Sequence, residues 1–294
     1  MTDIIPFDQR DGFIWYNGQF VDWKDAKVHV LNHGLHYASC VFEGERVYNK
    51  KIFKNELHSQ RLHNSAHSLG FKIPYSVEDL NKFKIETVAK QNITDGYMRV
   101  FAWRGSEKMA ISAQGNKIHV AIACWPWPPY YSDEARKKGL KLKFAKYRRP
   151  SPETAPTSAK AAGLYMICTI SKHEAENEGY NDALMLDYRG YLAEATGANL
   201  FLVMKNGEIH TPIPDCFLNG ITRQTVIELA RKKGITVNER HIKPEEFADA
   251  KDAFLTGSAA EITRISNIQD QYIYPEPDKI TLGLIEDYKN LVRS

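Results

Sequence analysis

The chain has 294 residues, of which 43% are hydrophobic and 26% are charged, and its formal net charge is +3. These ordinary values exclude disordered and fibrous classes, and the mixing of basic with acidic residues along the chain argues against nucleic-acid binding. No apolar run approaches the roughly 18 residues of a membrane span, and Met1 to Arg10 lack the apolar core of a signal peptide. Four scattered cysteines without a C-x-x-C pair indicate a reduced compartment. We therefore expect a cytoplasmic protein without nucleic-acid, membrane or metal partners.

The first half of the chain predicts an α+β unit that opens with a hairpin. Asn17-Gly18 favours a tight turn, because both residues tolerate positive φ. Ser76, followed three residues later by Asp79, is a capping signature for the start of a helix. Strands are expected over 14–16, 19–21, 41–48, 52–53, 97–103 and 118–125, and helices over 55–69 and from 76 to about 90.

A proline-rich aromatic segment, Trp125 to Tyr131, follows these elements. Its three prolines exclude a helix and a central strand, so we interpret it as the connection between two domains, although a surface loop without function fits it equally well. The expected organisation is a small domain at 1–125, an interdomain loop at 126–138 and a larger domain at 139–294. In the second half, strands are expected over 140–147, 183–187, 191–193, 200–204 and 253–255, and helices over 161–178 and 222–233.

Two turns rich in small residues could bind an anion. Gly220-Ile221-Thr222 directly precedes a helix, whose free N–H groups and dipole attract negative charge, although an N-cap role for Thr222 alone is the simpler explanation. Residues 256–260, Thr-Gly-Ser-Ala-Ala, follow a strand and expose backbone N–H groups, but a turn required for close packing is equally consistent with them. Neither turn matches a Walker A or a dinucleotide fingerprint.

Lys160 is surrounded by small residues in the segment 158–163, Ser-Ala-Lys-Ala-Ala-Gly. A poorly solvated lysine has a lowered pKa, and its neutral amine can attack a carbonyl carbon. Most lysines have no such role, so this pattern alone is weak. Glu194 ends a short strand before another run of small residues, where it could bind a ligand, although a solvated turn residue is the commoner case.

Arg61 lies on an expected helix, where a surface charge is the usual role. His58, His63 and His67 on the same helix suggest a metal site only weakly, because no other ligands occur at suitable spacing. Taken together, a reactive lysine, a carboxylate, an arginine and two anion-binding turns are the parts needed to hold a phosphorylated pyridine aldehyde.

A series of motifs occurs in a fixed order along the chain. The motifs are His36 to Gly44, Gln60-Arg61-Leu62, Tyr97-Met98-Arg99, Ser158-Ala159-Lys160, Glu194 to Phe201, Gly220 to Arg223 and Gly257 to Thr263. This series resembles the class IV aminotransferases, and most closely the branched-chain ones, over about residues 14 to 265. The resemblance implies the α+β architecture of fold type IV, with a small N-terminal and a larger C-terminal α/β domain. It also implies pyridoxal 5′-phosphate between the domains and a homodimer or larger homo-oligomer.

The resemblance assigns roles in cofactor binding. It implies that Lys160 forms a Schiff base with the cofactor, that Glu194 bonds the pyridine nitrogen and that Tyr165 bonds the phenolic oxygen. The phosphate would be held by Arg61, Ile221, Thr222 and Ser258.

The resemblance also assigns a substrate site. Tyr97 and the backbone of Ala259 would receive the α-carboxylate, and Arg99 would receive the second carboxylate of glutamate. Gly44 and Ala260 complete this set. The apolar side-chain pocket would be lined by Tyr37, Phe42, Tyr130 and Tyr165.

The reaction implied is the transfer of the amino group from leucine, isoleucine or valine to 2-oxoglutarate, giving branched 2-oxo acids and L-glutamate. Glu194 would keep the pyridine nitrogen protonated, and Lys160 would move the α-proton as general base and acid. The Tyr-x-Arg pattern at 97–99 favours this group over D-amino-acid aminotransferases, where Arg-x-His is expected. The alternatives are (R)-amine or D-amino-acid transamination and aminodeoxychorismate lysis on the same fold, or a non-enzymatic protein that binds ligands.

Overall fold

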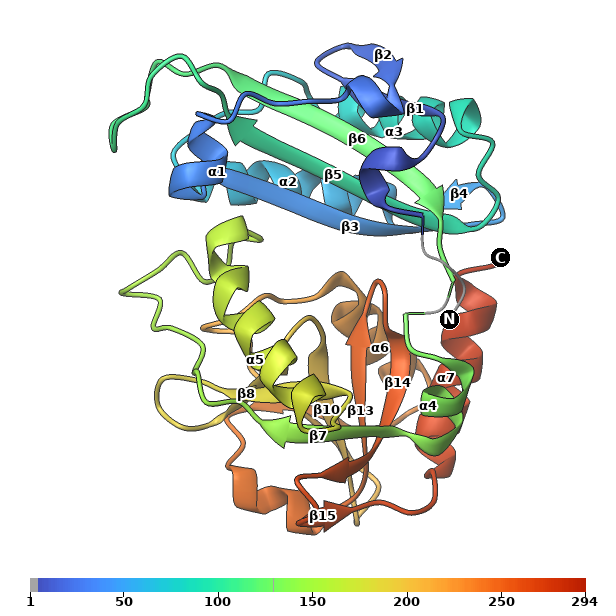
Figure 1. The fold of residues 1–294 in the computed structure, drawn as a ribbon. Helices are drawn as coiled ribbons and strands as arrows, with labels where there is room; N and C mark the ends of the chain where they lie inside the picture. Colours follow the sequence, from blue (N-terminus) through green and yellow to red (C-terminus); the bar gives the residue numbers. More distant parts are fainter. Residues whose placement is uncertain (1–4, 129) are drawn as a thin grey trace. The chain divides into compact units, whose positions relative to one another are not determined.

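The structure is a computed structural model that describes residues 5–128 and 130–294 (Figure 1). Residues 1–4 of the expected N-terminal domain and Pro129 of the expected interdomain loop lie outside the described residues. The chain divides into two compact units. Unit 1 contains the chain up to Pro128 together with Ala159–Gly163, and unit 2 contains the remainder. Each unit combines helices with a β-sheet, so the expected α+β class is confirmed.

Unit 1 is built on an antiparallel sheet of six strands in the order β2-β1-β6-β5-β3-β4. Helices α2 and α3 pack against this sheet, α2 on β3 and α3 on β1 and β6 (Figure 1). The strands are β1 (Phe13–Tyr16), β2 (Gln19–Asp22), β3 (Cys40–Tyr48), β4 (Lys51–Ile52), β5 (Gly96–Arg104) and β6 (Ile118–Pro126), the α-helices are α1 (His33–Tyr37), α2 (Asn55–Ser68) and α3 (Val77–Lys90), and the 3-10 helices are η1 (Phe7–Gln9) and η2 (Trp23–Asp25).

Local signals in the sequence account for several of these boundaries. Asn17 and Gly18 form the β1–β2 turn with φ values of 49° and 97°. At the start of α3, the Ser76 hydroxyl accepts a hydrogen bond from the Asp79 N–H, and the Asp79 carboxylate accepts one from the Ser76 N–H, both at 3.1 Å. The hairpin and the capping box are therefore confirmed, because each depends on residues close together in the chain.

The edge of β3 is completed by a segment from far along the sequence. β4 pairs only with Val47 and Tyr48, which leaves the other end of β3 open. Ala161 forms an antiparallel bridge with Val41 there, and the Phe42 N–H donates to the Lys160 carbonyl at 3.1 Å. These contacts explain why residues 159–163 belong to unit 1, although we expected them in the C-terminal domain.

The helix that we expected from residue 161 begins later. A 3-10 turn, η3 (Ala162–Tyr165), precedes α5 (Met166–Asn177). The start at 161 is wrong because the bridge to Val41 keeps that residue extended, so helical spacing of apolar residues beyond it could not decide the boundary.

Part of the nine-stranded sheet of unit 2 forms a closed ring. Successive pairings run β10-β13-β14-β7-β8-β9, and β9 pairs again with β10 through Glu194 and Asn199. Helices α6 and α7 pack on β13 and β14, and α5 packs on β8 (Figure 1). The strands are β7 (Leu140–Phe144), β8 (Asp182–Leu186), β9 (Leu192–Ala195), β10 (Asn199–Met204), β11 (Ile209–Pro212), β12 (Val237–Arg240), β13 (Ala250–Gly257), β14 (Glu261–Ile268) and β15 (Tyr272–Ile273), and the remaining helices are α4 (Asp133–Lys138), α6 (Ile221–Lys232), η4 (Pro244–Asp249) and α7 (Lys279–Leu291).

A single apolar core fills this ring. Every strand of the ring contributes a fully buried side chain to it, namely Leu142, Leu184, Leu192, Leu200, Leu255 and Ile265. Burying such side chains contributes about 1.5 to 3 kcal/mol each before the entropy of folding is subtracted. The ring is therefore a rigid base for the turns that leave its strands.

The segment 126–138, expected to be an interdomain loop, contains the last residue of β6 and the helix α4, so it is not a loop throughout. Among residues 5–128 and 130–294, no helix combines the length and the apolar composition that a membrane crossing requires.

Candidate functional site

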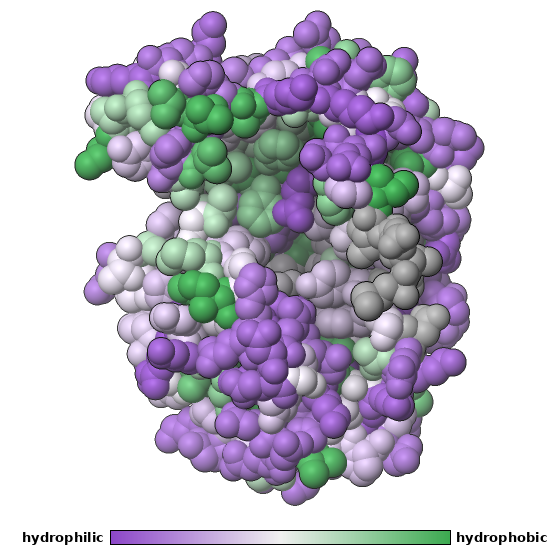
Figure 2. Space-filling model, viewed as in Figure 1, coloured by the Kyte–Doolittle hydropathy of each residue, from purple (hydrophilic) through white to green (hydrophobic). Residues whose placement is uncertain are grey.

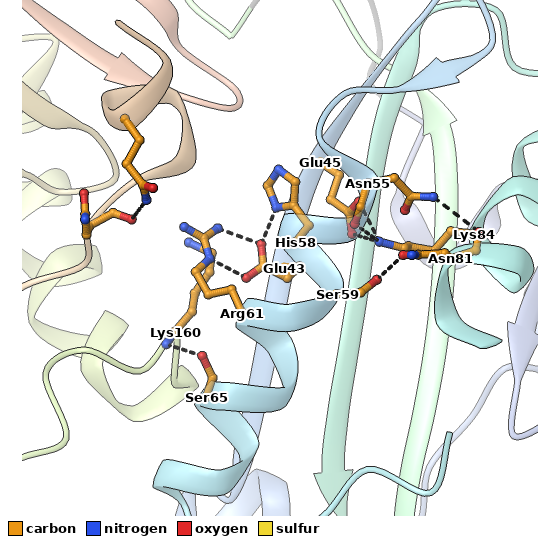
Figure 3. Close-up of polar contacts among 12 residues, drawn as sticks. Glu43, Glu45, Asn55, His58, Ser59, Arg61, Ser65, Asn81, Lys84 and Lys160 are labelled. Atoms are coloured by element: carbon orange, nitrogen blue, oxygen red, sulfur yellow. Dashed lines mark hydrogen bonds and ion pairs between the residues drawn. The ribbon is translucent and has the colours of Figure 1, made fainter. Parts of the chain in front are cut away.

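Lys160 is held at the open edge of the sheet in unit 1. Its backbone N–H donates to the Ser65 hydroxyl on α2 at 2.9 Å, and its carbonyl accepts from Phe42 on β3. The side-chain amine Nζ lies 4.9 Å from the centroid of the Phe42 ring. The main chain of Lys160 is thus fixed on both sides, which limits the positions that its amine can reach (Figure 3).

The amine of Lys160 is also chemically distinct. Burial, together with the positive charges of Arg61 and Arg99, lowers its pKa to about 8, against the opposing effect of Glu43. At physiological pH a substantial fraction of this amine is therefore neutral and nucleophilic, which is rare for lysine. The sequence predicted a lowered pKa from the small neighbours of Lys160. In the structure, burial and the charges of Arg61 and Arg99 lower it.

Arg61 on α2 is oriented by a buried carboxylate. Glu43 accepts hydrogen bonds from Arg61 Nε and Nη2, each at 2.7 Å, and its Oε2 lies 2.6 Å from His58 Nδ1 (Figure 3). Burial alone would raise the pKa of Glu43, but Arg61 and His58 hold it well below its ordinary value. Arg61 is consequently part of a largely buried ion pair rather than the surface charge that its helix suggested.

Glu43 and His58 were not identified as site residues from the sequence. Glu43 and Glu45 lie two apart on a strand, so they share one face, and Glu45 forms its own buried ion pair with Lys84 at 3.0 Å. Alternating acids within a largely apolar strand were the available signal, since such groups require buried cationic partners. His58, which suggested a metal site weakly, bonds Glu43 instead.

Four expected substrate-binding residues, Phe42, Gly44, Tyr97 and Arg99, lie together in unit 1. The guanidinium carbon of Arg99 is 4.6 Å from the Phe42 ring centroid and 5.5 Å from that of Tyr97. Gly44 is the register partner of Arg99, and a Cβ built on it would lie 1.9 Å from the Tyr97 hydroxyl. The hydroxyl of Tyr97 therefore occupies space that only a glycine at position 44 leaves open.

Tyr37 lies elsewhere in unit 1, at the end of the short helix α1. Its ring packs 4.7 Å from that of His33, and the residue is exposed. Tyr37 therefore contacts another ring of its own helix.

In unit 2, Glu194 and Asn199 face one another where the strand ring closes. Glu194 is buried, and its Oε2 accepts a hydrogen bond from Asn199 Nδ2 at 3.2 Å. Its Oε1 lies 3.4 Å from Nε of Arg149, which is buried as well. Burial alone would lower the pKa of Arg149, but Glu194 and Cys168 raise it above its ordinary value. Glu194 is thus a buried anion rather than a solvated turn residue.

The N-terminus of α6 lies next to this carboxylate. The Gly220 N–H donates to Asn199 Oδ1 at 3.1 Å, and Gly220 is the N-cap of α6 without a side-chain cap. Thr222 is the second helical residue and is buried, so the N-cap role considered for it is wrong. A helix of twelve residues that begins with a glycine cap leaves backbone N–H groups for an anion.

The second turn rich in small residues lies near the same point. Asn199 is the register partner of Thr256 as well as of Glu194, so the turn after β13 begins beside the end of β9. A Cβ on Gly257 would lie 3.2 Å from the Gly197 carbonyl, so this turn contacts the turn that joins β9 to β10. Ser258, Ala259 and Ala260 belong to this turn.

Two expected tyrosines of unit 2 have different surroundings. Tyr165 ends η3 and lies near Arg149, whose pKa it helps to raise. Tyr130 packs 4.8 Å from the ring of Tyr131 and remains exposed.

Except for Tyr37 and Tyr130, the expected residues therefore form one group in each unit. In unit 1 the group is Lys160, Arg61, Phe42, Gly44, Tyr97 and Arg99. In unit 2 it is Glu194, Tyr165, Gly220 to Thr222 and the turn 257–260. Each group carries both a charged side chain and a means of binding an anion.

Comparison with known proteins identifies the family of the chain. Residues 40–268 match the family described as Amino-transferase class IV. The chain is 40% identical over 292 residues to the probable branched-chain-amino-acid aminotransferase of Rickettsia conorii, covering 99% of both chains. It is similar to the crystal structure of the branched-chain amino acid aminotransferase of Escherichia coli, with a TM-score of 0.92, 35% identity, and coverage of 96% of this chain and 95% of the other.

A second solved structure is equally similar. The T.th. branched-chain amino acid aminotransferase with pyridoxamine 5′-phosphate has a TM-score of 0.92 and 35% identity, with 97% of this chain and 96% of the other covered. These similarities confirm the resemblance drawn from the ordered motifs and the fold type IV architecture. The chain belongs to the class IV aminotransferases.

Proposed function

We propose that this chain is an aminotransferase for leucine, isoleucine and valine that uses pyridoxal 5′-phosphate and 2-oxoglutarate. The relatives named as branched-chain-amino-acid aminotransferases support the substrate class. A neighbouring structure with pyridoxamine 5′-phosphate supports the cofactor class. The observation that carries the proposal is the amine of Lys160, whose pKa is lowered to about 8 beside Arg61.

The residues present fit such a cofactor. Its phosphate needs N–H donors and a cation, which the N-terminus of α6 and Arg61 supply. Its pyridine nitrogen needs an acidic partner, and Glu194 is a buried carboxylate. We assign the phosphate to Arg61, Ile221, Thr222 and Ser258, the ring nitrogen to Glu194 and the phenolic oxygen to Tyr165.

Pyridoxal 5′-phosphate, when bound, supplies an aldehyde and an electron-accepting ring. Lys160 Nζ would hold the cofactor between turnovers, take the α-proton of the amino acid and later return a proton. Its lowered pKa suits both tasks, because a group that titrates near the working pH can accept and release a proton with little cost. Glu194 would keep a proton on the ring nitrogen through its negative charge.

One site must accept both an apolar amino acid and glutamate. We propose that Phe42, with Tyr130 and Tyr165, provides the apolar surface, while Arg99 receives the second carboxylate of glutamate. Arg99 lies 4.6 Å from the Phe42 ring, so a charged and an apolar contact are available within one region. Tyr97, Gly44 and the turn at Ala259 and Ala260 would receive the α-carboxylate.

The experiment has two parts. The purified protein should be yellow, and borohydride should bleach it and attach the cofactor to Lys160, as identified by peptide mass. A coupled assay with leucine and 2-oxoglutarate should yield glutamate. Lys160→Ala should lose both properties and stay folded, whereas Lys146→Ala, which changes an exposed lysine, should keep them.

The two parts separate the alternatives. Bound cofactor without glutamate formation would favour a D-amino-acid or (R)-amine transaminase or a lyase on the same fold. A colourless protein that pyridoxal 5′-phosphate does not stabilise would contradict the proposal as a whole.

We also propose that the chain functions in the cytoplasm as a homo-oligomer. Val30, Leu35 and Ile111 of unit 1 are 71%, 70% and 87% exposed. Figure 2 shows apolar side chains gathered over the part of unit 1 that carries α1. Such side chains favour burial against another copy. Light scattering should give a dimer or larger species, which Leu35→Glu should weaken.

A further inference from the structure

Asn199, the first residue of β10, occupies a junction of unit 2. Its backbone pairs with Glu194 on one side and with Thr256 on the other. Its side-chain amide donates through Nδ2 to Glu194 Oε2 at 3.2 Å and to the Leu218 carbonyl at 3.0 Å, and its Oδ1 accepts from the Gly220 N–H at 3.1 Å. One buried side chain therefore connects a carboxylate, a loop and the cap of α6.

The contacts leave little freedom at this junction. A Cβ on Gly220 would lie 2.2 Å from Asn199 Oδ1, so the cap of α6 approaches the amide as closely as a glycine permits. The other oxygen of Glu194, Oε1, faces Arg149 Nε at 3.4 Å. An amide is the side chain that suits this place, because it donates two hydrogen bonds and accepts one without adding a charge.

We propose that Asn199 is a positioning residue that fixes the distance and orientation between Glu194 and the N-terminus of α6. The inference rests on the proposed function, in which Glu194 meets the ring nitrogen and α6 meets the phosphate of the same cofactor. The ring and phosphate are joined by a short linker, so the two protein groups must keep a matching separation. An error of about 1 Å in such a constellation can cost about 100-fold.

The test uses Asn199→Asp in two backgrounds. Aspartate still accepts from the Gly220 N–H, but it cannot donate to Glu194 and places a like charge beside it. We expect the affinity of the apoprotein for pyridoxal 5′-phosphate, measured by fluorescence quenching, to fall about 10-fold or more. In the Glu194→Gln background the new glutamine amide can donate to the aspartate. Asn199→Asp should therefore lower the cofactor affinity much less in that background.

This double-mutant comparison separates positioning from general support of the fold. A residue that only stabilises the sheet would impose the same penalty in both backgrounds, and that additive result would overturn the inference. The pH at which the absorption band of the bound cofactor titrates should shift in Asn199→Asp and return toward its value in Glu194→Gln when both changes are present. An unshifted titration would count against the inference as well.

The matched control is Asn238→Asp. Asn238 also donates from Nδ2 to a carboxylate, Glu208 Oε2 at 3.0 Å, in the same unit but on β12. It should leave cofactor affinity unchanged. If Asn199→Asp does not fold, Asn199→Ala serves in the same two backgrounds, with a smaller penalty expected beside Glu194→Gln.

The outcomes for the two proposals differ. Wild-type chain that binds no pyridoxal 5′-phosphate would contradict the proposed function. Wild-type chain that binds it, with equal penalties in both backgrounds, would overturn only the role of Asn199.

Discussion

Arg61 and Glu43 meet edge to edge, with Nε and Nη2 of the guanidinium each 2.7 Å from a different carboxylate oxygen. Such a bidentate pair fixes the plane of the arginine as well as its position. His58, at 2.6 Å from Oε2, holds the carboxylate from a third direction. Arg61, the proposed phosphate-binding residue, is therefore oriented before the cofactor binds. This reduces the loss of side-chain entropy on binding.

Glu43→Gln should destabilise the chain by about 3 kcal/mol, because it leaves the largely buried charge of Arg61 without its counter-ion. Urea unfolding of the apoprotein would measure this loss, and affinity for pyridoxal 5′-phosphate should fall with it. Glu56→Gln is the control. Glu56 is an exposed acid on α2, the helix of Arg61, and it accepts a hydrogen bond from Gln60 at 3.1 Å. A loss below about 1 kcal/mol in Glu43→Gln, the size of a surface pair, would contradict the prediction.

The pKa of Lys160 predicts how stability varies with pH. Because this pKa is about 8 in the folded chain and 10.5 ordinarily, the unfolded chain binds more protons between these values. The stability of the apoprotein should therefore rise with pH in that window. Relative to Lys160→Met, which cannot titrate, we expect a gain of about 2 kcal/mol between pH 7.5 and 10.

Urea unfolding of both proteins at several pH values checks this expectation. The difference between wild type and Lys160→Met isolates one group, since other titrating residues are common to both. A difference that stays constant, or falls with rising pH, would show that the pKa of Lys160 is not lowered in the folded chain.

Much of unit 1 was predictable because its signals are local. The turn at Asn17-Gly18 and the capping box at Ser76 and Asp79 each depend on residues within one turn, and the structure has them as expected. The start of α5 was missed because the backbone of Ala161 is held by Val41, which lies far away in the sequence. Local propensity does not report such a contact.

The site residues also divide into those that the sequence predicts and those that it does not. The motifs identified Lys160 and Glu194, because each stands out from the small residues around it. The roles of Glu43 and Asn199 could not be predicted, since they depend on which groups face them across a sheet or from a helix. Glu43 accepts a hydrogen bond from Arg61 on α2, and Asn199 accepts one from Gly220 at the cap of α6. Neither partner is near in the sequence.

Gly44→Ala should displace Tyr97. The added Cβ would lie 1.9 Å from the Tyr97 hydroxyl oxygen and 2.9 Å from its ring carbon Cζ, and Tyr97 is itself buried. We expect a loss of stability of about 1 to 3 kcal/mol and a raised KM for amino acids. The cost should be smaller in the Tyr97→Phe background, where the hydroxyl is absent.

The control for this change is Gly115→Ala, because a Cβ at Gly115 has no atom within 4 Å. Thermal unfolding and steady-state kinetics of the four variants provide the measurements. Equal losses for Gly44→Ala with and without the Tyr97 hydroxyl would show that the two residues do not compete for space.

Arg99 should distinguish the two substrates. Arg99→Met keeps a long apolar side chain against Phe42, 4.6 Å away in the native chain, but cannot bond a second carboxylate. We expect kcat/KM for 2-oxoglutarate to fall about 30- to 100-fold, the loss of a charge-assisted contact, with a much smaller effect on leucine. Arg46→Met is the control, because Arg46 stacks on Tyr48 in the same sheet without an assigned role in binding. Equal losses for both substrates in Arg99→Met would mean that Arg99 supports the sheet rather than recognising the dicarboxylate.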